Sequence, residues 1–97
     1  MIQTEIKVFE GLNTYYNENF KAPAHVKVYS KAPSYIKIEK LDPPYIVLKA
    51  KKDYEVRIEI EPIEVPEDAP EEEKNKVSGE VLKLEEEGEE EKKEEKE

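Results

Sequence analysis

The segment from Lys21 to Ala50 repeats one pattern in consecutive blocks of ten residues, KAPAHVKVYS, KAPSYIKIEK and LDPPYIVLKA. A proline stands third in each block, and the fifth to eighth positions read HVKV, YIKI and YIVL. β-Branched and aromatic residues that alternate with polar ones are typical of strands with one buried and one solvated face. Proline has no amide hydrogen, so Pro23, Pro33 and Pro43 are expected at strand starts or in turns. The blocks therefore predict three short strands that share one set of packing rules.

The same alternation continues on both sides of these blocks. It occurs in residues 2–9, in residues 54–60 and, less regularly, in residues 77–84. We expect the three blocks to form a meander, with an internal duplication as the alternative. The run from Tyr45 to Leu48 is apolar on both faces, which favours a central strand. One sheet leaves its apolar face bare, so the strands near residues 2–9 and 77–84 are expected to form the covering sheet.

The charge of the chain is unevenly distributed. Residues 1–65 carry ten basic and ten acidic side chains, whereas residues 66–97 carry six basic and fifteen acidic ones and hold the whole net charge of −9. The last segment, EEEGEEEKKEEKE, contains nothing to bury, so residues 85–97 are expected to form a disordered tail. Such a tail should repel nucleic acid and anionic membranes. Its candidate electrostatic contacts for a basic partner are Glu85, Glu86, Glu87, Glu89, Glu90 and Glu91, while a merely solvating role and loose divalent-cation binding are the alternatives.

The sequence carries few signals of catalysis. His25 is the only histidine, and we interpret it as an ordinary residue at the start of a strand. The serines at positions 30, 34 and 78 have no base beside them in sequence, and the glycines are too scattered for a phosphate loop. There is no cysteine, which excludes disulfides and thiolate metal sites. We therefore expect that this protein is not an enzyme and that it has neither a cofactor nor a metal site.

Aromatic residues offer the candidate binding site. Tyr15, Tyr16 and Phe20 lie in the stretch GLNTYYNENF, whose asparagines favour turns. We expect this stretch to be a loop whose aromatic side chains cap the open end of the sheet packing. The alternative is an exposed patch, together with Tyr29, that binds a protein partner. Lysines near Tyr29 would also suit a nucleic-acid platform, but the neutral body and anionic tail argue against nucleic acid.

Residues 35–84 resemble part of a known family. The segments are PPYIVL (43–48), a lysine-rich turn (49–53), the alternating strand YEVRIEI (54–60), VPEDAP (65–70) and SGEV (78–81). Together they resemble the C-terminal half of prokaryotic immunoglobulin-like domains of the NEW3/CARDB type. The resemblance implies a sandwich fold and a structural or interaction module, because that fold hosts adhesion, spacer and partner-binding roles alike.

The expected fold is all-β. It is a small immunoglobulin-like β-sandwich of about six to seven antiparallel strands in residues 1–84, followed by the disordered acidic tail. We expect a noncatalytic structural or protein–protein interaction module with a protein partner. The alternative is an acidic-tailed, chaperone-like or decoy cofactor of a basic nucleic-acid-binding protein. No signal peptide and no membrane span are recognised, so the expected location is cytoplasmic. The abundance of lysine and glutamate suits a thermophile.

Overall fold

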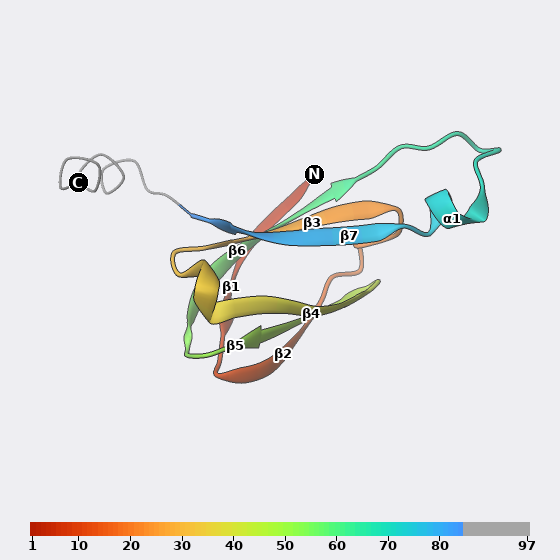
Figure 1. Ribbon diagram of the computed structural model, residues 1–97. Coiled ribbons are helices and arrows are strands. Elements are labelled where there is room, and N and C mark those ends of the chain that lie inside the picture. The colour runs from red at the N-terminus through yellow and green to blue at the C-terminus, as the bar shows by residue number, and fades with distance from the viewer. Residues whose placement is uncertain (85–97) are drawn as a thin grey trace, which may run out of the picture.

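The computed structural model describes residues 1–84, which form two packed sheets (Figure 1). The strands are β1 (Ile2–Val8), β2 (Gly11–Tyr16), β3 (Ala24–Ser30), β4 (Ile36–Asp42), β5 (Tyr45–Ala50), β6 (Tyr54–Pro62) and β7 (Val77–Lys83). Two short helices lie in the connections, the 3₁₀ helix η1 (Pro33–Tyr35) and α1 (Glu71–Lys74). The predicted all-β sandwich is confirmed.

The strand order defines the two layers. One sheet has the order β1-β6-β3-β7 and the other has the order β2-β5-β4. All strand pairs are antiparallel except β3 and β7, which run parallel. Strands β2, β5 and β4 are grouped apart from β3, β6 and β7, as in immunoglobulin constant-type domains. Here β1 joins the second group beside β6, and β7 lies on the far side of β3.

The prediction that the three ten-residue blocks form a meander is wrong. The three ten-residue blocks form β3, β4 and β5 as predicted, but β3 lies in one sheet while β4 and β5 lie in the other. The expected covering sheet is also wrong, because β1 and β7 are the two edges of the sheet that contains β3 and β6. Alternation identifies which face of a strand is buried, but it does not identify the neighbouring strand. The prediction that residues 45–48 are central is confirmed, since β5 is the middle strand of its sheet.

Strand β2 occupies a stretch that the sequence predicts to be a loop. The chain turns into it at Gly11, whose φ of +103° lies in the region that favours glycine. The side chain of Asn13 stabilises this turn, accepting from the Phe9 amide at 2.9 Å and donating to the Phe9 carbonyl at 2.8 Å. The Glu10 amide donates to the Asp53 carboxylate at 2.8 Å, which ties the turn to the β5–β6 connection. Local hydrogen bonds thus support a strand that is rich in asparagine.

The core lies between the two sheets. Its buried apolar side chains come from every strand except β2 and β7, with one more from the β2–β3 connection; they are Val8, Phe20, Ala24, Val26, Val28, Ile36, Ile46, Leu48, Ala50, Val56, Ile58 and Ile60. Ile38 and Leu41 of β4 and Val77 and Val81 of β7 pack around its margin. Because one face of each strand is buried this way, the alternate residues are presented to solvent on two outer faces.

Candidate functional site

The structure does not bring the four predicted binding aromatics together. Phe20 is only 1% exposed and belongs to the core, and Tyr15 packs against the core with its hydroxyl accepting from the Asn17 side-chain Nδ2 at 3.2 Å. These two positions agree with the capping interpretation. Tyr29 lies half-buried on β3, where Arg57 stands 5.9 Å from its ring centroid. Only Tyr16 is prominently exposed. The tail glutamates at positions 85–87 and 89–91 lie outside the described residues.

A second aromatic residue, which the sequence did not single out, stands beside Tyr16. Tyr45 of β5 is its register partner, and the two ring centroids are 5.5 Å apart at an interplanar angle of 54°. That separation and tilt are typical of a favourable aromatic pair. Both rings are exposed, Tyr16 by 56% and Tyr45 by 42%. The sequence contained one signal for this position: Tyr45 begins a strand in which residues 46 and 48 are buried, so residue 45 faces outward.

The pair belongs to a larger outer face of the β2-β5-β4 sheet. Thr14 lies opposite Val47, and Leu12, 66% exposed, lies opposite Lys49. We call this surface the aromatic face; it consists of Leu12, Thr14, Tyr16, Tyr45 and Val47. Along β4 it is bordered by charged residues that lie opposite β5, namely Lys37, Lys40 and Asp42. An exposed apolar strip with a charged margin has the composition of a protein-contact surface.

The outer face of the other sheet is polar. Gln3 of β1 donates to the Glu59 carboxylate at 2.6 Å, and Lys27 of β3 lies opposite both Glu59 of β6 and Glu80 of β7. Cross-strand neighbours of opposite charge stabilise a solvated face modestly. The two outer faces of the sandwich therefore differ: one carries apolar and aromatic side chains, and the other carries alternating charges.

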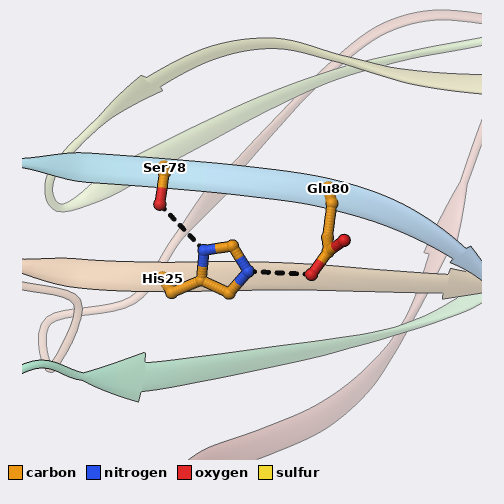
Figure 2. Close-up of polar contacts among 3 residues, drawn as sticks. All are labelled: His25, Ser78 and Glu80. Atoms are coloured by element: carbon orange, nitrogen blue, oxygen red, sulfur yellow. Dashed lines mark hydrogen bonds and ion pairs between the residues drawn. The ribbon is translucent and has the colours of Figure 1, made fainter.

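His25 is the centre of a polar cluster on this second face (Figure 2). Its Nδ1 lies 2.8 Å from the Ser78 hydroxyl and its Nε2 lies 2.9 Å from the Glu80 carboxylate. Both partners come from β7, where they stand two residues apart and so point to the same side as His25 of β3. These partners lie more than fifty positions from His25 in sequence, so no local pattern could reveal them.

The cluster contains the three groups of a serine–histidine–carboxylate relay, and all three side chains stand on the outer face of the neighbouring strands β3 and β7. The imidazole bridges two β7 side chains from the neighbouring strand and so adds side-chain contacts to the backbone pairing of this parallel edge strand. Acyl transfer would also require hydrogen-bond donors aimed at a developing oxyanion and a site for the substrate. His25, Ser78 and Glu80 do not line any of four grooves on residues 1–84, which lie elsewhere on the surface.

Comparison of the chain with protein-family models, with curated proteins and with solved structures gives no match. Within residues 1–84, no three histidine, aspartate or glutamate side chains are grouped to hold a metal ion. In the same range, no helix is long and apolar enough to cross a membrane. The description of the site therefore depends on the geometry of its own residues.

Proposed function

We propose that this protein is a noncatalytic interaction module that binds a protein partner through the aromatic face. The observation that carries the proposal is the exposed, adjacent pair Tyr16 and Tyr45, with Leu12 further along the same strand. Tyrosine buries a large rigid area at low entropic cost and is enriched among residues that dominate binding energy. The resemblance of residues 35–84 to NEW3/CARDB-type domains supports the same class of function.

The charges around the aromatic face define the partner further. Lys37, Lys40 and Lys49 lie on the same side of the sheet as the two tyrosines. The acidic residues of this margin are Glu39 and Asp42. A partner that presents apolar side chains at the centre of its contact and carboxylates toward the lysine margin complements this surface. We therefore propose a protein surface of that composition. A single-stranded nucleic acid, which also stacks on tyrosine and pairs with lysine, is the competing ligand class that the experiment must separate.

The test compares variants of the full chain as baits for proteins of the source cell. The double variant Tyr16→Ala/Tyr45→Ala removes the pair, and Tyr29→Ala is the matched control because Tyr29 is on the opposite outer face. A photo-crosslinking residue at position 16, with one at position 29 for comparison, identifies the partner that touches the face. Affinity is then measured by calorimetry with the purified partner, with and without nuclease treatment.

We expect the double variant to weaken binding at least ~10-fold, since hot-spot aromatics contribute more than ~1 kcal/mol each. The control should bind like the wild type, and binding should survive 0.5 M salt. Equal losses in both variants, or a captured ligand that disappears with nuclease, would overturn the proposal. Binding that is lost in salt and when the six tail glutamates are changed to glutamine would instead favour the acidic-tailed cofactor of a basic protein.

A further inference from the structure

Lysine side chains converge at one end of the sandwich. Lys37 of β4 and Lys49 of β5 are directly opposite each other in the register, and Lys51 follows in the β5–β6 turn. They border a groove of about 320 Å³, which we call the lysine groove; its lining residues are Ser34, Tyr35, Ile36, Lys37, Lys49 and Lys51. Lys52 adds a further cation, 4.7 Å from the Tyr35 ring centroid. The groove is therefore both cationic and partly aromatic.

This arrangement is unfavourable unless an anion screens it. Like charges directly opposite each other on neighbouring strands destabilise a sheet. The Glu39 carboxylate lies 3.7 Å from the Lys37 ammonium, and their side chains are 41% and 70% exposed, so solvent weakens this ion pair. Within residues 1–84, no carboxylate lies within ion-pairing distance of Lys49 or Lys51. The backbone of the groove is fixed, because the Lys51 amide donates to the Tyr35 carbonyl at 2.8 Å.

Strand β7, which the acidic segment follows in sequence, ends at the same end of the sandwich as the lysine groove. Strand β7 runs parallel to β3, so it ends on the side where η1 and the β5–β6 turn also lie (Figure 1). Leu84, the last described residue, donates its amide to the Ser30 carbonyl at 2.8 Å. It borders a depression with Tyr54, and Lys52 stands 5.7 Å from the Tyr54 ring and beside Tyr35. A continuous path of side chains leads from the end of β7 to the lysine groove.

We propose that the acidic segment 85–97 of the same chain binds in the lysine groove. Its nine glutamates complement the lysines, and thirteen extended residues reach as much as ~45 Å from Leu84. Tethering makes the encounter intramolecular, with an effective concentration in the millimolar range that an acidic peptide in trans rarely reaches. The groove is thus an acidic-peptide site with an occupant in cis. The proposal goes beyond the function of the aromatic face and does not require it, although the groove and the lysine margin of that face share Lys37 and Lys49.

The absence of cysteine makes the test direct, because Glu91→Cys gives a single position for a spin label. Paramagnetic broadening of backbone amides is recorded on the full chain at low salt and at 0.5 M NaCl, where the Debye length falls to about 4 Å. The groove variant Lys37→Gln/Lys49→Gln/Lys51→Gln is compared with a control that removes as many charges at the opposite end, Lys21→Gln/Lys74→Gln/Lys76→Gln. Amide dispersion shows whether each variant is folded, and the salt series on the otherwise unmutated chain needs no variant.

We expect amides of residues 34–37 and 49–52 to lose at least about twofold in intensity at low salt, as a tethered contact of this kind predicts. The loss should vanish at 0.5 M NaCl and in the groove variant, and should persist in the control. Broadening that is absent, or centred on another surface, would overturn the proposal, as would equal behaviour of the two variants. A mixture of spin-labelled chains with separate isotope-enriched chains shows whether the contact is intermolecular. If broadening appears only in that mixture, the groove binds the segment of a second copy, and the proposal is also overturned. Because no partner is present, these results do not test binding by Tyr16 and Tyr45, although Lys37 and Lys49 belong both to the groove and to the lysine margin of the aromatic face.

Discussion

At the scale of single residues, the most constrained polar group is Ser30. It is fully buried at the end of β3, and its hydroxyl lies 2.6 Å from that of Tyr54. The Ala32 amide donates to Ser30 Oγ at 3.0 Å, while the Tyr54 hydroxyl donates to the Ala32 carbonyl at 3.1 Å. The Ser30 hydroxyl therefore donates to Tyr54, which closes a ring of three hydrogen bonds. Every polar atom in the ring is satisfied, so its members should depend on one another.

Tyr54→Phe should lower the free energy of unfolding by about 1–2 kcal/mol, because it deprives the buried Ser30 hydroxyl of its acceptor. Ser30→Ala should cost a similar amount, and the double variant should cost less than the sum, with a coupling of about 0.5–1 kcal/mol. Urea denaturation followed by circular dichroism measures all three. Tyr29→Phe is the control, since no described residue bonds its hydroxyl, and it should change stability by less than about 0.5 kcal/mol. Strict additivity of the two substitutions would show that the ring is not cooperative.

At the scale of elements, the approach of β4 to β7 depends on Gly79. A Cβ atom at this position would stand 3.0 Å from the terminal methyl groups of both Ile38 and Leu41, and 3.2 Å from the Val26 carbonyl oxygen. The glycine therefore leaves room for two β4 side chains to cover the inner face of the edge strand. This gives a packing reason for the Ser78-Gly79 pair in the sequence.

Gly79→Val should lower the free energy of unfolding by about 1–3 kcal/mol, the usual cost of overpacking. Ile38→Val, which removes one of the two obstructing methyl groups, should recover part of that loss in the double variant. Chemical denaturation of the two single variants and the double variant measures the recovery. If Gly79→Val were as stable as the wild type, or if Ile38→Val only added its own cost, the close approach would not be the reason for the glycine.

The elements also show how far the sequence could predict this fold. Period-two alternation located β1, β3, β4 and β6 and, less regularly, β7, because a strand with one buried face must alternate; the apolar run at residues 45–48 located β5. It could not reveal which strands pair, since β1 and β6 are joined by contacts between residues about fifty positions apart. Strand β2 was missed because its asparagines indicate turns; in the structure, Asn13 bonds locally to Phe9, and the Glu10 amide ties the start of the strand to Asp53.

The candidate sites were predictable to a smaller extent. Tyr16 could be chosen from its sequence, but Tyr45 could be added only after the register between β2 and β5 was known. Likewise, Ser78 and Glu80 have the spacing of residues on one face of a strand, yet nothing local places them beside His25. In both clusters, the pairing register of strands far apart in sequence determines which side chains become neighbours. A single sequence contains that information only through the folded structure.

At the scale of the whole molecule, the two sheets share one core and should unfold together. The inward side chains of β6, such as Ile58, and of β5, such as Leu48, are completely buried in the same cluster. Neither sheet can separate without exposing that apolar surface, so partial unfolding that keeps one sheet intact should be strongly disfavoured. Edge strands should open locally more easily than central strands, because an edge strand is hydrogen-bonded to a neighbour on one side only.

Hydrogen exchange tests this cooperativity. Amides of β5, β3 and β6 should exchange most slowly, with opening free energies equal within about 0.5 kcal/mol to each other and to that of global unfolding. Amides of β2 and of the first residues of β1 should exchange through smaller openings. The rates are measured by NMR at two pH values, which establishes that exchange reports equilibrium opening rather than its rate. A β5 that opened at several kcal/mol less than β6 would show that the two sheets are separate cooperative units, and that the aromatic face rests on the weaker one.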